Sequence, residues 1–108
     1  MRKAVNLLVR REEMTHEEFV EYWLEEHAPM AESLPGIRKY STSLPADPER
    51  AAYDGIAELY LESETTVNEV FSTEAGERLQ ADTTNFLDLD AGEFLVVDET
   101  VQFDNSER

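Results

Sequence analysis

The stretch Ala4-Val5-Asn6-Leu7-Leu8-Val9 decides the fold, because it is short, apolar and partly β-branched. Such a run predicts a β-strand. Both faces of this strand are largely apolar, since Asn6 is its one polar residue. A strand with one solvent-exposed face would alternate between apolar and polar side chains. We therefore expect a sheet that is covered on both sides.

A helix is predicted to follow this strand. Thr15 and Glu18 have the spacing of a capping box at a helix start. Aromatic and apolar side chains then recur at helical spacing and form one stripe: Phe19, Trp23, His27 and Met30. Pro29 lies inside this pattern, so we expect a kink or break near His27-Ala28. Pro35-Gly36 is expected to end the helical segment.

The rest of the chain predicts three more strands and one more helical region. The strands are expected at residues 37–44, 55–61 and 93–103, and the helical region at 64–86, interrupted near Gly76. With right-handed crossovers, the order βαββαβ gives an α+β, ferredoxin-like fold. Its four-stranded antiparallel sheet carries both helices on one face. We expect residues 1–108 to form a single domain.

This topology leaves one apolar sheet face without a cover. The uncovered face would include Val5, Leu7 and Val9 of the first strand. In the last strand, apolar side chains share one parity: Leu95, Val97, Val101 and Phe103. A monomer would expose them as a large apolar patch. We therefore expect a symmetric homodimer that packs two sheets face to face.

The composition limits the classes of partner. The chain has 25 Asp and Glu residues against 9 Lys and Arg residues, a formal net charge of −16. Such a surface repels phosphate groups, so we expect neither nucleic acid nor membranes as partners. The absence of cysteine excludes disulfides and thiolate sites. No apolar run is long enough for a transmembrane helix, and we expect a cytoplasmic protein.

The excess of acidic residues is also typical of halophilic proteins, because concentrated salt screens their self-repulsion. The alternative is an ordinary acidic protein. If the chain is adapted to salt, its melting temperature is expected to rise between low salt and molar KCl. A melting temperature that does not rise in a thermal melt would contradict this interpretation.

His27 is the main candidate for chemistry. It lies on the predicted buried stripe one turn from Trp23, where an imidazole could act as a general acid or base. The alternative is a core histidine bonded to a backbone carbonyl that Pro29 leaves free. His16, the one other histidine, is predicted to be exposed and about 16 Å away along the helix, so the two cannot share a metal ion. We expect no metal site.

Several polar and aromatic side chains could accompany His27. Asn6 needs partners in an apolar strand, so it either bonds to backbone or lines a polar cavity. Tyr40 and Tyr60 offer phenol groups from two predicted strands. Phe19 and Trp23 are expected to be core residues that also shape a pocket. Glycines are too few and too scattered for a dinucleotide site.

Most of the chain resembles the EthD family. The most specific segment is Tyr22-Trp23-Leu24-Glu25-Glu26-His27-Ala28-Pro29, followed by Pro35-Gly36. Residues 5–11, 14–19 and 34–40 add to the likeness, and 57–60, 81–86 and 96–99 resemble later blocks of the family. The resemblance implies a dimeric α/β barrel, whose relatives include cofactor-free monooxygenases, polyketide cyclases and muconolactone isomerases.

The resemblance also implies site residues. Muconolactone-isomerase-like relatives use a histidine near the end of the first helix and a tyrosine in the second strand, and these positions fall on His27 and Tyr40. Haem-degrading relatives carry an asparagine in the first strand, as Asn6 is here. They also use a histidine in the second half of the chain, and this sequence has none there. This difference argues against haem chemistry.

Three hypotheses follow. The first is a cofactor-independent oxygenase, isomerase or cyclase for a small, partly apolar carbonyl or phenolic compound. In this enzyme the catalytic residues would be His27 and Tyr40, and the substrate-binding residues would be Asn6, Phe19, Trp23 and Tyr60. The second is a non-catalytic dimer that binds or carries the same kind of small molecule. The third is a protein with a filled core and no cavity beside His27.

Overall fold

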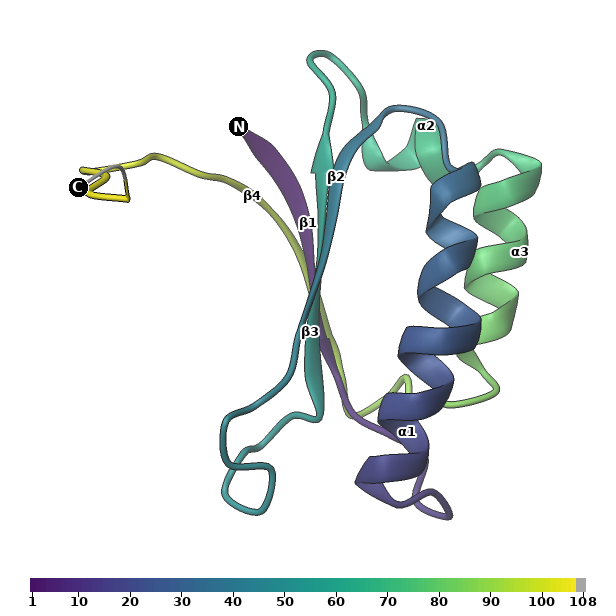
Figure 1. Cartoon of the computed structure of the whole chain (residues 1–108). Helices are drawn as coiled ribbons and strands as arrows, with labels where there is room; N and C mark the ends of the chain where they lie inside the picture. The colour runs from purple at the N-terminus through teal and green to yellow at the C-terminus, as the bar shows by residue number, and fades with distance from the viewer. Residues whose placement is uncertain (107–108) are drawn as a thin grey trace.

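A four-stranded antiparallel sheet carries helices on one face (Figure 1). The computed structural model describes residues 1–106. Its elements are β1 (Arg2–Leu8), α1 (His16–Tyr22), η1 (Trp23–His27), η2 (Ala28–Ser33), β2 (Ile37–Ser43), β3 (Gly55–Leu61), α2 (Val67–Phe71), α3 (Glu74–Thr83) and β4 (Glu93–Asp98). The strand order is β2-β3-β1-β4, and every neighbouring pair is antiparallel. The α+β, ferredoxin-like prediction is confirmed.

The first helical segment begins and breaks where the sequence predicts. The Glu18 backbone N–H donates to Thr15 Oγ1 at 3.1 Å, and the Thr15 N–H donates to Glu18 Oε1 at 2.8 Å, which completes the capping box. The winding then widens to a π-helix in η1 and tightens to a 3₁₀-helix in η2. Pro29 has no N–H to donate, so regular α-helical bonding cannot continue past it. The change of winding falls between His27 and Ala28.

The second helical region divides earlier than predicted. It breaks between α2 and α3, at Ser72 and Thr73, whereas we expected the interruption near Gly76. Gly76 lies buried inside the first turn of α3, where its N–H donates to Thr73 Oγ1 at 3.0 Å. A Cβ at position 76 would lie 2.5 Å from the Val70 carbonyl oxygen. Gly76 is therefore required for close packing of the two helices and does not end either of them.

Replacing Gly76 with alanine is expected to destabilise the fold. Overpacking should lower the free energy of unfolding by about 1–3 kcal/mol. This exceeds the gain of up to about 1 kcal/mol from removing a helical glycine. Urea unfolding of Gly76→Ala measures the difference, with the exposed Glu77→Ala of the same helix as the control. A Gly76→Ala protein as stable as the control would contradict this packing argument.

The last strand is shorter than predicted and ends at Asp98 instead of residue 103. β4 pairs only with β1, and Asp98 lies opposite Arg2, the first residue of β1. Beyond this pair the Glu99 N–H donates to the Met1 carbonyl at 2.9 Å, and no backbone hydrogen bond beyond Met1 and Glu99 joins the two segments in residues 1–106. The apolar alternation that continues to Phe103 therefore does not form a strand.

The two faces of the sheet differ in what covers them. The helix-facing side packs against α1, η1 and α3, with Trp23, Phe19 and Phe86 fully buried. No element of residues 1–106 covers the other side (Figure 1). We call this side the far face; its apolar members are Val5, Leu7, Ile56, Leu95 and Val97. Leu95 is 45% exposed there. Within the described residues, no helix has the length and apolar composition to cross a lipid bilayer.

Candidate functional site

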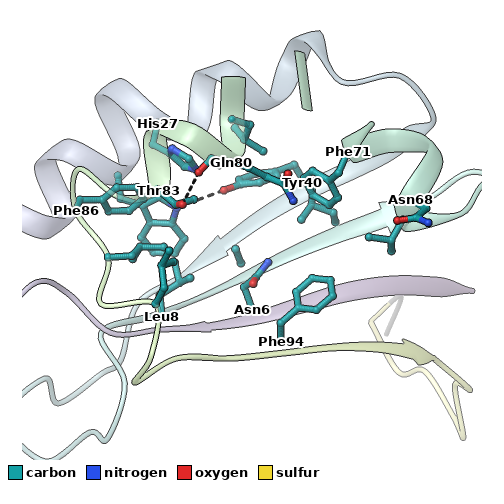
Figure 2. A pocket seen from close by; sticks show the side chains of 17 residues that line it. Asn6, Leu8, His27, Tyr40, Asn68, Phe71, Gln80, Thr83, Phe86 and Phe94 are labelled. Atoms are coloured by element: carbon teal, nitrogen blue, oxygen red, sulfur yellow. Dashed lines mark hydrogen bonds between the residues drawn. The ribbon is translucent and has the colours of Figure 1, made fainter. Parts of the chain in front are cut away.

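A cavity of about 440 Å³ lies between the helix-facing side of the sheet and the helices (Figure 2). Asn6 and Leu8 of β1 and Phe94 of β4 lie on the sheet side. His27 of η1 and Phe71 of α2 lie on the helix side. The lining is mostly apolar, and polar groups are few. This is the usual make-up of a small-molecule site.

Four of the six predicted site residues line this cavity: Asn6, Trp23, His27 and Tyr40. Asn6 extends from the sheet toward the helices (Figure 2). Within residues 1–106 its amide makes no hydrogen bond to protein, and no buried polar side-chain atom lacks a partner. The amide therefore reaches the open space of the cavity. Of the two alternatives for Asn6, lining the cavity is the one that the structure shows.

The other two predicted residues lie outside the cavity. Phe19 is fully buried behind Trp23, and their ring centroids are 5.4 Å apart. Tyr60 lies on the far face, because it alternates with Leu59, which lines the cavity. There its ring centroid is 5.0 Å from the ammonium groups of both Lys3 and Lys39. Phe19 supports the wall of the cavity, and Tyr60 is separated from it by the sheet.

A glycine allows Trp23 to reach the sheet. Gly55 begins β3, and a Cβ at this position would lie 2.4 Å from Cζ3 of the Trp23 indole. The indole therefore packs directly on the backbone of the strand. From this position Trp23 Nε1 donates to the Tyr40 hydroxyl at 3.3 Å.

His27 is held by a carboxylate. Its Nδ1 lies 2.7 Å from Asp82 Oδ2, and the His27 residue is only 6% exposed. Oδ1 of Asp82 accepts from the Tyr22 hydroxyl at 2.7 Å and from Asn85 Nδ2 at 2.9 Å. The alternative interpretation of His27 had a backbone carbonyl as its partner, and the structure places a carboxylate there. The Phe86 ring lies 4.7 Å from the imidazole.

The environment keeps Asp82 ionised. Burial is the largest influence and opposes its ionisation, but the hydrogen bonds with Tyr22, His27 and Asn85 together outweigh it and lower the pKa of Asp82. The hydrogen bond to Asp82, with burial added, raises the pKa of Tyr22, which stays a phenol and a donor. Asp82 is therefore a carboxylate at neutral pH.

His27 and Tyr40 line the cavity and keep hydrogen-bonding capacity that no protein group in residues 1–106 uses. Within residues 1–106, Nε2 of His27 has no protein partner, and it is not a buried, unsatisfied atom. Burial raises the pKa of Tyr40, against a smaller opposing effect of the bond from Trp23. Tyr40 is thus a neutral phenol that accepts from Trp23 and keeps its own proton for another acceptor. Both groups can bind an oxygen atom of a ligand.

His16 differs from its prediction. Its side chain is 22% exposed, and its Nδ1 lies 2.9 Å from Oδ1 of the buried Asp54. The same oxygen accepts from Arg10 Nη1 at 2.8 Å, and Oδ2 accepts from the Arg10 backbone N–H at 2.9 Å. His16 therefore belongs to a structural cluster outside the cavity. Within the described residues, no three His, Asp or Glu side chains form a group that could hold a metal ion.

The sequence did not point to Asp82, Tyr22 or Asn85. Asp82 is one of 25 acidic residues, and its local spacing has no special pattern. One usable signal was the polar run of residues 82–85 directly before Phe86, near the end of the second helical region. The ferredoxin-like topology brings this end close to the first helical segment. Choosing Asp82 from that run requires the packing of α3 against η1.

Comparisons with solved structures show the same fold. An EthD family protein from Bacillus halodurans C-125 superposes with a TM-score of 0.78 at 20% identity, covering 93% of this chain and 99% of the other. SnoaB from Streptomyces nogalater, described as a cofactor-independent oxygenase, gives 0.67 at 10% identity and covers 97% and 96%. A dimeric ferredoxin-like protein from Bacteroides fragilis NCTC 9343 gives 0.68 at 12%, covering 91% and 95%.

The family is shown by the sequence itself. No curated protein matches the chain. The model of the EthD domain, however, matches residues 11–90, which include the helix carrying His27, strands β2 and β3, and the helix carrying Asp82. The chain belongs to the EthD domain family.

Proposed function

We propose that this protein is a cofactor-independent enzyme of the oxygenase, isomerase or cyclase type, and that residues 1–108 act as one domain. The observation that carries the proposal is the position of His27. His27 lines a largely apolar cavity; one of its ring nitrogens is bound to a carboxylate, and the other has no protein partner among residues 1–106. The family and the structural likeness to a cofactor-independent oxygenase support it.

The lining of the cavity supports one class of substrate. Among residues 1–106, no lysine, arginine, aspartate or glutamate side chain lines it. A ligand carboxylate or phosphate would find no counter-ion there, and the charge of −16 would also repel it. Aromatic walls such as Trp23, Phe71 and Phe94 favour a partly apolar, uncharged molecule. A small carbonyl or phenolic compound meets both conditions.

The proposed chemistry begins with removal of one proton. His27 accepts a proton from a carbon beside a carbonyl, or from a phenol, and the electron pair moves to the substrate as an enolate or phenolate. The Tyr40 hydroxyl and the Asn6 amide donate hydrogen bonds to the oxygen that gains charge. An isomerase then returns the proton to another carbon. A cyclase adds the enolate carbon to a second carbonyl of the same molecule, and the new alkoxide takes the proton back from His27. An oxygenase adds dioxygen to the enolate or phenolate carbon, and the hydroperoxide that forms loses water to leave a carbonyl, so that dioxygen is the oxidant and water carries away its second oxygen atom.

The enzyme is proposed to be a homodimer that buries the far face. The charged side chains of its strands are two lysines and two glutamates: Lys3, Lys39, Glu58 and Glu93. They sum to zero, and Glu99, which bonds to Lys3, adds one negative charge at the edge of this face in a chain of net charge −16. This face can therefore approach a copy of itself without strong repulsion. Two similar folds, from Thermobifida fusca YX and Bacteroides fragilis, are described as dimeric.

A ligand screen tests the enzyme proposal. Small lactones, quinols and β-diketones are added to the protein, binding is followed through the NMR signals of His27, and the compounds are analysed for chemical change. We expect at least one class to bind and to be converted. The alternative function is a carrier that uses the same cavity, and it predicts that a bound compound is released unchanged. Binding that leaves the His27 signals unmoved would contradict both functions.

A further inference from the structure

A histidine that accepts a proton must present an unprotonated nitrogen to the substrate. A neutral imidazole carries one hydrogen, on Nδ1 or on Nε2, and the partner of one nitrogen fixes the state of the other. In this structure Asp82 faces Nδ1 at 2.7 Å, which leaves Nε2, the nitrogen without a protein partner in residues 1–106, for the cavity that His27 lines. The identity of the residue at position 82 therefore decides whether His27 can act as a base.

We propose that Asp82, clamped by Tyr22 and Asn85, is a positioning residue that keeps the hydrogen of neutral His27 on Nδ1 and leaves the Nε2 lone pair to the cavity. The inference rests on the proposed role of His27 as a proton acceptor. A carboxylate oxygen accepts hydrogen bonds and has no hydrogen to donate, so the Nδ1–H form is the one that satisfies both groups. Once Nε2 is protonated, the same carboxylate stabilises the imidazolium.

The hydrogen bonds from Tyr22 and Asn85, which we call the clamp, fix which carboxylate oxygen of Asp82 faces His27. Oδ1 accepts from the Tyr22 hydroxyl at 2.7 Å and from Asn85 Nδ2 at 2.9 Å, and both of these groups are donors. Oδ2 is left for His27. The Asp82 side chain is 16% exposed, so little water competes for either oxygen. The three contacts together give the carboxylate one orientation.

The clamp also predicts what an amide would do at this position. In Asp82→Asn the carbonyl oxygen must take the place of Oδ1, because Tyr22 and Asn85 both donate there. The amide NH₂ then points at Nδ1 of His27 and donates to it. His27 has to accept at Nδ1, so its hydrogen moves to Nε2 and the base is blocked. One substitution of nearly equal shape thus inverts the tautomer.

Long-range ¹H–¹⁵N NMR of the two histidines tests this inference without an activity assay. At a pH where both rings are neutral, wild-type His27 is expected to carry its hydrogen on Nδ1. In Asp82→Asn it should carry it on Nε2. His16 is an internal control, because its Nδ1 is bound to Asp54 and should not change. Asp90→Asn, at an exposed carboxylate, removes the same charge and should leave both histidines as in the wild type.

The outcomes separate this inference from the proposed function. A wild-type His27 with its hydrogen on Nε2 overturns the inference, and this result does not require a folded variant. The inference also fails if Asp82→Asn keeps the Nδ1–H form. With a converted substrate, Asp82→Asn should lower kcat by about 10²-fold or more with little change in KM. Inversion of the tautomer with unchanged turnover would leave the inference standing and remove His27 from the proposed reaction.

Discussion

Replacing His27 with glutamine is expected to lower kcat/KM for a converted substrate by about 10²–10⁴-fold, the usual contribution of a positioned acid or base. Glutamine is polar and of similar length, and its amide can still bond to Asp82. It has no nitrogen that accepts a proton near neutral pH. Binding of the substrate should change little, because the apolar walls of the cavity remain. The loss should therefore appear in kcat, measured by steady-state kinetics.

His16→Gln is the matched control for this experiment. His16 is also bound through Nδ1 to a carboxylate, but it lies outside the cavity. Its replacement should leave kcat/KM within a few-fold of the wild type. If His27→Gln turns over substrate as fast as this control, His27 is not the proton acceptor, and a carrier function becomes the better explanation of the cavity.

The double substitution Val5→Glu with Leu95→Glu is expected to convert the proposed dimer into monomers. The two residues are cross-strand partners at the centre of the far face. A two-fold interface would bring four new carboxylates together in an apolar contact. An unpaired buried charge costs about 3–5 kcal/mol, so dimer affinity should fall by at least about 10²-fold. Sedimentation velocity in 0.5 M salt, roughly the range where long-range repulsion is screened, measures the change.

Val96→Glu provides the comparison. Val96 is 45% exposed, as is Leu95, but it alternates with Leu95 and points to the helix side of β4. It adds a carboxylate of the same exposure to the same strand without entering the proposed interface. This variant should stay dimeric. A monomeric wild type, or a double variant that remains a dimer, would contradict a shared far face.

The fold could be predicted where local sequence carries the signal. The capping box at Thr15 marks the start of α1, and the apolar run from residue 4 to 9 marks β1. Prediction failed where a distant contact decides the outcome. Glycine usually disfavours the interior of a helix, which is why the sequence predicts a break near Gly76. In the structure Gly76 lies within α3 and allows α2 and α3 to pack closely. The alternation at the end of the chain continues past residue 98, yet β4 ends at Asp98, opposite Arg2, where β1 begins.

For the candidate site too, residues marked by local sequence could be predicted, and residues whose role depends on a distant contact could not. The helical spacing of Trp23 and His27, and the polar character of Asn6, identified cavity residues from sequence. The prediction that Tyr60 binds substrate is wrong, because its parity in β3 places it on the face opposite Leu59, which lines the cavity. Asp82 could not be chosen because its role depends on how two helices pack, and the sequence contains many equivalent carboxylates.

The wide winding from Trp23 to His27 affects how this segment tolerates a change of length. A π turn holds one more residue than the α turn it interrupts. Deleting one residue from this turn would let ordinary α winding replace it, and the segments on either side would keep nearly the same relative orientation. The imidazole would therefore stay close to Asp82 and the cavity. A single-residue gap at this point in another family member would thus remove the irregular winding without removing the proposed proton acceptor.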